Sequence, residues 1–278
     1  MSPGRSPPST FTPVSHLLII FAAVSHTPLS VVIITFNEER NIGRCLDSVK
    51  TIADDIVVLD SFSTDRTEEI CRAKGARFFQ HAFDGHIEQK NRAITYAQHP
   101  FILSLDADEA PDETLLAEIR KVKEVKDADG YTMNRLTNYC GKWIRHCGWY
   151  PDTKLRLWDS AKGSWKGVNP HDRYELNAGG RVRHLRGDIL HYSYYTIEEH
   201  YKQAEKFSTI AAEAAFRLGK RSSVFLAMIK CAAKFIRNFI INAGFLDGKY
   251  GYIICRITAW ETWRKYIKLR DRNKTAAR

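Results

Sequence analysis

The sequence predicts an α/β fold with a mostly parallel sheet, a second part of mixed strands, and a helical C-terminal region. In the first part, short apolar segments rich in β-branched residues alternate with segments of helical pattern, which is typical of βαβ units. Beyond about residue 130 the apolar segments become shorter and alternate with polar residues, which favours a mixed sheet. From residue 196 onward the apolar spacing is helical.

The parallel part is predicted from four strands and the helices between them. The strands are expected at residues 29–35, 55–59, 76–83 and 101–105, and the helices at about 39–50, 64–74, 86–98 and 111–126. Thr64 and Asp65 are candidate caps of the second helix, because their side chains accept from backbone N–H groups at a helix start. Pro111 is expected to open the fourth helix.

The mixed part and the C-terminal region follow from the remaining periodicities. Shorter strands are expected at 130–138, 153–158, 180–185 and 188–194, and the Gly- and Trp-rich residues 163–167 are expected to form a loop. A long helix is expected at 197–218, and two further helical segments at 222–243 and 250–270. We therefore divide the chain into a Pro/Ser-rich disordered extension (1–28), a catalytic domain (29–195) and a helical region (196–278).

Basic charge is concentrated at the C-terminus. The 278 residues carry a net charge of +10, and residues 220–278 contain 14 Lys and Arg against 3 Asp and Glu. Lys230, Lys234 and Arg237 lie on the apolar segment 222–243, which argues against a membrane span and favours a helix at an anionic membrane surface. In segment 250–270 Trp and Tyr stand beside Arg and Lys, which also favours the headgroup region. The alternative is packing on the domain or on a partner subunit.

Other composition features narrow the function class. The six cysteines include no Cys-x-x-Cys pair, which fits a reducing compartment. Together with the basic C-terminal region, this predicts a cytoplasmic protein that is peripheral on the inner face of the cytoplasmic membrane. The basic region has no RNA-binding signature, so no nucleic-acid partner is expected, although a non-catalytic protein that binds nucleic acid or anionic lipid is the alternative class. Phosphate loops of ATPases and dehydrogenases are absent from the sequence.

The strongest chemical signal is a group of acids after the strand at 101–105. Asp106, Asp108 and Glu109 follow it directly, where open α/β sheets bind ligands. Two carboxylates in this position can hold a hard cation such as Mg²⁺ or Mn²⁺, which commonly bridges to phosphate oxygens. The sequence therefore predicts a metal-dependent enzyme with a diphosphate-bearing substrate, and the alternative is an exposed acidic turn.

Four motifs in order along the chain carry a family resemblance. They are Val-Val-Ile-Ile-Thr-Phe-Asn-Glu-Glu (31–39), Val-Val-Leu-Asp-Ser-Phe-Ser-Thr-Asp-Arg-Thr (57–67), Gln-Lys-Asn-Arg-Ala (89–93) and Leu-Asp-Ala-Asp-Glu (105–109), with His-Tyr-Ser-Tyr (191–194) as a later marker. With these motifs the chain resembles glycosyltransferase family 2, the inverting enzymes of GT-A fold, and within it the lipopolysaccharide inner-core β-glucosyltransferase branch. The resemblance implies transfer of a hexose, glucose from UDP-glucose, onto a membrane-linked saccharide such as lipopolysaccharide core. A polyprenyl-linked, capsule or peptide acceptor is the alternative.

The resemblance also implies roles for individual residues. The residues it assigns to the donor are Thr35, Asn37 and Glu38 for the nucleotide pocket, Asp60 for the uracil or ribose, Lys90 and Asn91 for the diphosphate or sugar, and Asp106 for the ribose and donor sugar. Asp108 would hold the divalent metal. The simpler alternatives are that Asn37 and Asp60 cap turns and that Lys90 is a solvated residue on the surface of a helix.

The general base is expected after the mixed strands. The family branch carries a His-Glu pair there, and the matching residues of this chain are His171 and Asp172, so Asp172 is the candidate base with His171 as an orienting residue or metal contact. Glu175 and Asp188 are weaker alternatives. His191 is a candidate contact to the metal or diphosphate, with a structural histidine as the alternative. The loop 84–88 departs from the glycine- and phenylalanine-rich version of the branch, which leaves the donor sugar open.

Overall fold

The computed structural model describes residues 26–168 and 171–276. In these residues nine strands form one sheet in the order β3-β2-β1-β4-β8-β6-β11-β5, with β7 paired to β6. The strands are β1 (Leu29–Thr35), β2 (Asp55–Asp60), β3 (Arg77–Gln80), β4 (Phe101–Asp106), β5 (Glu109–Pro111), β6 (Gly130–Tyr139), β7 (Lys142–Ile144), β8 (Asp152–Asp159) and β11 (Val182–Tyr194). Most of the predicted extension 1–28 lies outside the described residues.

The four N-terminal strands pair in parallel, as the βαβ rhythm predicts. β1 lies between β2 and β4, and β3 is at the edge. The later strands continue the same sheet in mixed directions: β8 is antiparallel to β4 and β6, whereas β11 is parallel to β6. The predicted α/β class, with a mostly parallel sheet and a mixed continuation, is thereby confirmed.

Helices and a hairpin cover the two faces of the parallel strands. The helices are α1 (Ile42–Val49), α2 (Thr67–Ala73), α3 (His86–Thr95) and α4 (Glu113–Glu124). One core joins α1 and α4 to β1 through residues such as Leu46, Ile119 and Val31. The other joins α3 to the opposite face through Ala93 and Val32. Successive strand residues point to opposite faces, so the apolar runs supply both cores.

A hairpin replaces the predicted loop at 163–167. The strands β9 (Gly163–Val168) and β10 (His171–Leu176) pair antiparallel, with Trp165 opposite Tyr174, after a short 3-10 helix at Ser160–Lys162. The Tyr174 ring stacks on Trp158 of β8 with centroids 3.8 Å apart. The loop prediction was wrong because burial of these aromatic rings outweighs the turn preference of the glycines around them.

Two further element boundaries differ from the prediction. Pro111 ends strand β5 instead of opening a helix, and α4 begins at Glu113 because the Asp112 side chain caps it by accepting from the Leu115 N–H. The strands predicted at 180–185 and 188–194 are one strand, β11, whose register to β6 shifts between His184 and Asp188. Gly187 lies at this shift with a positive φ of 92°, a conformation that glycine adopts readily.

The C-terminal region is a helical unit. It contains α5 (Ile197–Arg217), α6 (Val224–Ile236), a π-helical segment η2 (Arg237–Ile241), a 3-10 segment η3 (Gly244–Asp247) and α7 (Gly248–Ala276). Small residues let α5 approach α7: Ala204, Ser208, Ala212 and Ala215 are buried along one stripe of α5. No helix in the described residues is long and apolar enough to cross a membrane.

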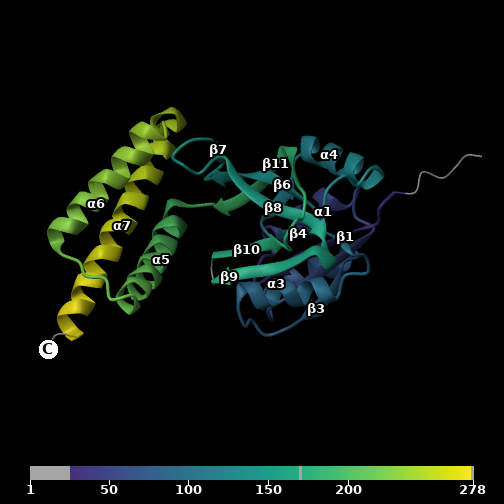
Figure 1. Ribbon diagram of the computed structural model, residues 1–278, viewed down its shortest axis with the longest axis horizontal. Coiled ribbons are helices and arrows are strands. Elements are labelled where there is room, and N and C mark those ends of the chain that lie inside the picture. Colours follow the sequence, from purple (N-terminus) through teal and green to yellow (C-terminus); the bar gives the residue numbers. More distant parts are fainter. Residues whose placement is uncertain (1–25, 169–170, 277–278) are drawn as a thin grey trace, which may run out of the picture.

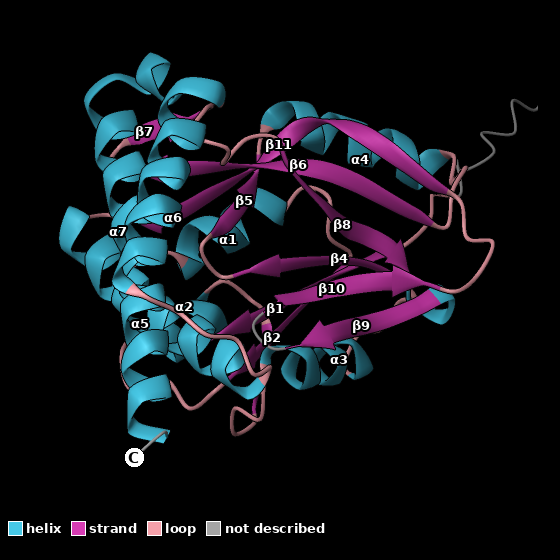
Figure 2. Ribbon diagram, turned by 60° about the vertical axis from the view of Figure 1, so that its left-hand side comes forward, coloured by secondary structure: helices cyan, strands magenta, loops and turns pink. Residues whose placement is uncertain are grey.

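The helical unit stands beside the carboxyl ends of the parallel strands. Figure 1 shows α5, α6 and α7 together on one side of the sheet, and Figure 2 shows the arrowhead of β4 directed toward them. The connection at residues 195–196 is fixed locally. Thr196 caps α5 in a reciprocal capping box with Glu199, and the guanidinium of Arg40 lies 3.2 Å from the centre of the Tyr195 ring.

Candidate active site

A cavity of about 1060 Å³ lies between the sheet and the helical unit. One wall consists of residues at the carboxyl ends of β1 and β4, from α3 and from β10, and the other wall comes from α5, α6 and α7. Open α/β sheets bind ligands at this edge. Several predicted site residues line the cavity together: Thr35, Glu38, Lys90, Asp106, Asp108, Asp172 and His191.

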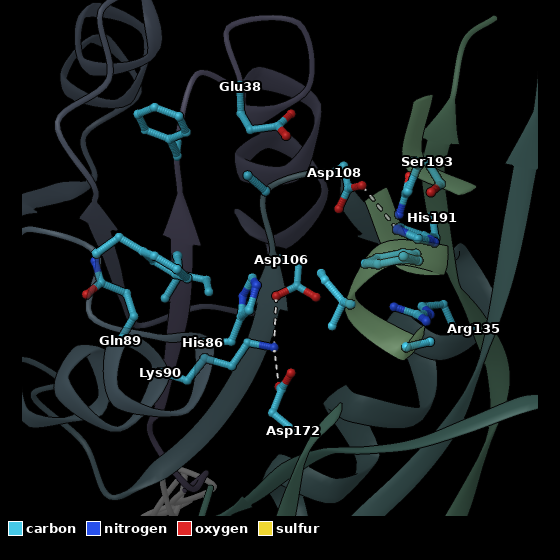
Figure 3. A pocket seen from close by; sticks show the side chains of 18 of the residues that line it. Glu38, His86, Gln89, Lys90, Asp106, Asp108, Arg135, Asp172, His191 and Ser193 are labelled. Carbon is cyan, nitrogen blue, oxygen red and sulfur yellow. Dashed lines mark hydrogen bonds and ion pairs between the residues drawn. The ribbon is translucent and has the colours of Figure 1, made fainter. Parts of the chain in front are cut away.

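Lys90 connects two of these carboxylates. Its Nζ lies 3.2 Å from Asp106 Oδ1 and 2.8 Å from Asp172 Oδ2, as the dashed lines in Figure 3 show. The side chain comes from α3 on the same face of the sheet as Asp106, and it is only 5% exposed. The ammonium also lies 4.4 Å from the centre of the Trp165 ring on β9. Lys90 is therefore a buried site residue, and the simpler role of a solvated helix residue does not describe it.

Asp106 is held in its charged form by two cations. Its Oδ2 lies 2.9 Å from Nη2 of Arg156, in addition to the Lys90 contact. Burial alone would raise the pKa of Asp106, but Lys90 and Arg156 outweigh it and hold the pKa well below its ordinary range. The same Arg156 nitrogen lies 3.0 Å from Glu109 Oε1, so one buried guanidinium on β8 binds two of the three acids at the β4–β5 turn.

Arg156 and Arg135 were not predicted from the sequence. Arg156 is 3% exposed, and Arg135 lines the cavity with Nη1 3.3 Å from Glu109 Oε1. A signal for Arg156 does exist, because it stands two residues before the buried Trp158 on a predicted strand and therefore shares its face. Arg135 has no comparable local signal, since the acid it binds lies 26 positions earlier in the chain.

Asp108 and His191 form the second charged pair of the cavity. Asp108 Oδ2 lies 3.1 Å from His191 Nε2, which brings the β4–β5 turn against β11 (Figure 3). Burial alone would raise the pKa of Asp108, but His191 lowers it below its ordinary value. Conversely, burial would lower the pKa of His191, and Asp108 raises it instead. The imidazole is thereby favoured in its protonated form while no other cation neutralises Asp108.

Three more lining residues have the character of ligand-binding groups. Burial raises the pKa of Glu38 to about 7, with Asp108 and Asp65 adding to the rise and a hydrogen bond from Asn41 opposing it. Thr35 Oγ1 and Gln89 Oε1 are buried and, within the described part of the chain, accept or donate no hydrogen bond. Because a buried polar atom without a partner is costly, these two atoms mark places where a bound molecule can complete the hydrogen bonding.

Other predicted residues lie outside the lining of the cavity. Asn37 has a positive φ of 53°, and its side chain accepts from the Thr64 N–H. Asp60 is fully buried and accepts from the backbone and hydroxyl of Ser63. The Asn91 amide makes two 3.0 Å hydrogen bonds with the Trp165 backbone and so fixes β9 to α3. All three side chains organise the loops that border the cavity.

The base candidates are separated by the fold. Asp172 lines the cavity from β10, whereas the side chain of His171 lies outside the described residues. Glu175 pairs with Arg173 at 2.6 Å on the outer side of the hairpin, and Asp188 accepts from the Tyr150 hydroxyl at 3.0 Å. Neither of these two alternatives lines the cavity.

A divalent cation fits the chemistry of the Asp108 and His191 side chains. A carboxylate oxygen is a ligand that Mg²⁺ and Mn²⁺ prefer, and imidazole is a common additional ligand of transition metals. Among the described residues no group of three or more His, Cys, Asp or Glu side chains is arranged to hold a metal on its own. Phosphate oxygens and water would therefore have to complete the coordination, as is usual for Mg²⁺ with phosphate-bearing substrates.

A cavity at the carboxyl ends of parallel strands is where α/β enzymes bind their ligands, and comparison with known proteins specifies the family. The model of "Glycosyl transferase family 2" matches residues 30–187, more than half of the chain. The chain belongs to this family and is a nucleotide-sugar-dependent glycosyltransferase, which confirms the resemblance and the enzyme class predicted from the four motifs.

Relatives match over most of their length. An uncharacterized glycosyltransferase of Rickettsia typhi is 28% identical over 253 residues, covering 87% of each chain. The lipopolysaccharide core biosynthesis glycosyltransferase LpsC of Rhizobium meliloti is 26% identical over 258 residues, covering 86% of this chain and 93% of LpsC. Since both alignments exceed the family match, the relatives share the C-terminal helical region as well.

Solved structures with a similar fold are more distant. Glucosyl-3-phosphoglycerate synthase from Mycobacterium tuberculosis, solved with Mn²⁺, UDP and product, has a TM-score of 0.35 at 23% identity over 40% of this chain and 44% of its own. TarS of S. aureus has a TM-score of 0.41 at 16% identity over 66% of this chain and 40% of its own.

Proposed function

We propose that the enzyme transfers a hexose, glucose from UDP-glucose, with inversion onto a membrane-linked saccharide such as lipopolysaccharide inner core. The observation that carries this proposal is the cavity in which Lys90, Asp106, Asp108, Asp172 and His191 lie together at the carboxyl ends of the strands. The acceptor class is supported by the likeness to LpsC, which is named for lipopolysaccharide core biosynthesis.

Two groups of residues would bind the donor: those that hold the metal and those that contact the diphosphate and the nucleotide. Asp108 and His191 are the side chains that would hold Mg²⁺ or Mn²⁺, and a bound cation would neutralise the charge that develops on the departing diphosphate. Lys90 offers an ammonium within the same wall, and Thr35 and Gln89 offer unpaired polar atoms. Thr35 and Glu38 lie at the end of β1, where the nucleotide would enter.

Asp172 is the proposed general base. An inverting transfer needs a carboxylate that removes the proton of the acceptor hydroxyl on the side away from the leaving group. Asp172 faces Asp106 across Lys90, so both carboxylates are within reach of one cation. If the Lys90 ammonium turns to the donor diphosphate, the Asp172 carboxylate loses its ion pair and becomes free to accept the proton.

The test is an Asp108→Asn variant assayed for UDP release from UDP-glucose with a lipopolysaccharide core acceptor. We expect a decrease of at least about 100-fold in the rate of UDP release. The metal would lose its carboxylate ligand, and the charge of the leaving diphosphate would no longer be neutralised. Asp47→Asn is the matched control, since Asp47 pairs with Lys74 on the surface of α1. Undiminished turnover of the Asp108 variant would remove the proposal. Polyprenyl-linked, capsule and peptide acceptors are assayed in parallel to separate the acceptor classes.

We further propose that the enzyme lies on the anionic inner surface of the cytoplasmic membrane through one face of its helical unit. This face, called the α6 face here, consists of exposed apolar residues on α6, η2 and η3: Phe225, Met228, Ile229, Ile236, Ile240, Ile241, Phe245 and Leu246. Exposed apolar groups of this number are uncommon on soluble proteins. Lys230 and Arg237 are exposed in the same segments, Lys249 is exposed at the start of α7, and residues 220–246 contain no Asp or Glu.

The structure excludes part of α7 from this role. Arg264 and Lys268, which the sequence pattern placed at the lipid headgroups, bind Glu205 of α5 at 2.8 and 2.9 Å. Arg272 binds Glu213 of α5 at 2.7 Å in the same manner. These three basic residues of α7 thus hold α5 and α7 together, and the membrane proposal rests on the α6 face.

Vesicle sedimentation tests the α6 face. Wild type should sediment with vesicles of phosphatidylcholine and phosphatidylglycerol but weakly with phosphatidylcholine alone, because the cationic rim needs anionic lipid. The Ile229→Asp/Ile240→Asp variant should lose most of this binding. Val125→Asp is the control, since Val125 is an exposed apolar residue at the end of α4, far along the chain from the α6 face. Equal sedimentation of all three proteins would refute the membrane proposal.

A further inference from the structure

Two lysines on the helical wall of the cavity have no ionic partner. Lys234 of α6 and Lys265 of α7 both line the cavity and are partly buried. Within the described residues neither side chain forms an ion pair or a hydrogen bond. They differ in this from Lys268 one turn further along α7, whose ammonium lies 2.9 Å from Glu205 and 2.7 Å from the Ser208 hydroxyl.

The charge of this wall is positive and uncompensated. The acidic side chain that lines the cavity on the helical wall is Glu261 of α7, and burial raises its pKa while Lys234 and Lys265 lower it. One carboxylate that is poorly solvated thus faces two ammonium groups. On the opposite wall Asp106, Asp108 and Asp172 are already paired with cations of the sheet. The excess positive charge is therefore local to the helical wall.

The rest of the helical wall suits a saccharide. Phe207 and Ile210 of α5 provide apolar surface, and Thr258 and Thr262 of α7 stand beside the two lysines in the lining. Both threonine hydroxyls donate to the helix backbone four residues earlier, and each oxygen keeps a lone pair for a sugar hydroxyl. Aromatic, aliphatic and hydroxyl side chains of this kind occur in sites where a few polar groups fix the orientation of a ligand.

The cavity is large for a single small ligand. Its volume of about 1060 Å³ is at the upper end of the range of roughly 300–1,000 Å³ found for pockets that hold one small ligand. The sheet wall carries the groups proposed for the donor. The helical wall is therefore available to the acceptor, which has to reach Asp172 from the side away from the leaving group.

We propose that Lys234 and Lys265 form a subsite for an anionic group, a phosphate or a carboxylate, on the acceptor saccharide. This inference rests on the proposed function, because it assigns the helical wall to the acceptor of the same reaction. The enzyme would then select acceptors that carry negative charge near the sugar to be modified. Acceptor charge, in addition to acceptor sugar, becomes a determinant of specificity.

Kinetics with three forms of one acceptor test the subsite. The acceptors are a phosphorylated lipopolysaccharide core oligosaccharide, the same oligosaccharide after removal of its phosphates, and the same oligosaccharide with its carboxyl groups reduced to alcohols. We expect the Lys234→Gln/Lys265→Gln variant to raise KM at least about tenfold for the charged acceptor while kcat changes less than about twofold, since ground-state binding is lost. The modified form that wild type uses poorly shows whether the phosphate or the carboxylate is the group that the lysines bind.

Controls separate the subsite from the donor site and from general damage. Lys274→Gln removes an exposed lysine of α7, the helix that carries Lys265, and should leave KM for all three acceptors unchanged. KM for UDP-glucose should stay within about twofold in the double variant. An increase in KM for UDP-glucose instead of the acceptor would overturn the inference by placing the lysines on the donor. An equal rise in KM for the unmodified acceptor, the phosphate-free form and the carboxyl-reduced form would overturn it as well.

A binding measurement keeps the inference testable without turnover. The lysines are labelled by ¹³C reductive methylation, and inorganic phosphate and acetate are titrated in turn while the lysine signals are followed by NMR. We expect two signals that shift besides that of Lys90 in the donor site, one absent in Lys234→Gln and the other in Lys265→Gln. If no shift other than that of Lys90 is lost in the double variant, the subsite is overturned. If the two signals shift but no saccharide accepts glucose, the proposed function fails while the anion site stands.

Discussion

Arg156 Nη2 lies 2.9 Å from Asp106 Oδ2, and the same nitrogen lies 3.0 Å from Glu109 Oε1. Glu109 is 1% exposed and Arg156 is 3% exposed, so this contact is shielded from water. Association with two carboxylates raises the pKa of Arg156 despite its burial, and the side chain stays charged. The turn that carries Asp108 is therefore fixed by a buried ionic contact from β8.

The Arg156→Met variant tests this contact. It leaves Glu109 buried with Arg135 as its remaining cation at 3.3 Å, so we expect a loss of about 3–5 kcal/mol in the free energy of unfolding, measured by urea titration. Adding Glu109→Gln to the variant should restore part of the stability, because the unpaired charge is removed. Equal destabilisation of the single and double variants would show that the loss comes from packing instead.

Asp172 is tested by two substitutions of different length and charge. Asp172→Asn should lower kcat by about 10²–10⁴-fold, because the amide cannot accept the acceptor proton. Asp172→Glu keeps the carboxylate and should retain more activity than the amide variant. The measurement is UDP release at saturating donor and acceptor, with the melting temperature as the check on folding. If the amide and glutamate variants are equally active, Asp172 is not the base.

Glu38 makes stability depend on pH. Its pKa is about 7 in the folded protein against an ordinary 4.5, so between these values the folded state retains a proton that the unfolded chain has released. The stability associated with this proton is present below about pH 4.5 and is lost as pH rises through about 7. We expect Glu38→Gln to gain about 2–3 kcal/mol relative to wild type between pH 4.5 and 8 in urea titrations with EDTA. If the difference in free energy of unfolding between the two proteins does not change with pH, the raised pKa of Glu38 is not its cause.

Two glycines in helices give opposite predictions for the same substitution. A Cβ on Gly251 of α7 would lie 1.9 Å from the Gly244 carbonyl oxygen, so Gly251→Ala should destabilise the protein by about 1–3 kcal/mol. A Cβ on Gly43 of α1 would meet its nearest neighbour, Lys74 Cε, at 3.4 Å, and Gly43→Ala should stabilise by about 0.5–1 kcal/mol. Thermal unfolding of both variants measures the contrast. A stabilised Gly251→Ala would show that α7 can move away from η3.

The sequence by itself determined the α/β class, the four parallel strands and the position of the acidic turn after β4. These features depend on periodicity and on the order of neighbouring residues, which are local properties of the chain. It also determined the family, because three of the four motifs mark the ends of β1, β2 and β4 and the fourth lies on α3. Element boundaries at Pro111 and at the β9–β10 hairpin were wrong where capping by Asp112 and burial of Trp165 decided the conformation.

Only the tertiary structure decided which charged groups meet. Arg156 reaches Asp106 across 50 residues, and Lys90 reaches Asp172 across 82, whereas Arg264 is taken up by Glu205 across 59 instead of facing lipid. Each pairing depends on how strands and helices pack, because an ion pair needs its atoms within about 4 Å and sequence spacing does not specify that distance. The second wall of the cavity, with Lys234 and Lys265, exists for the same reason.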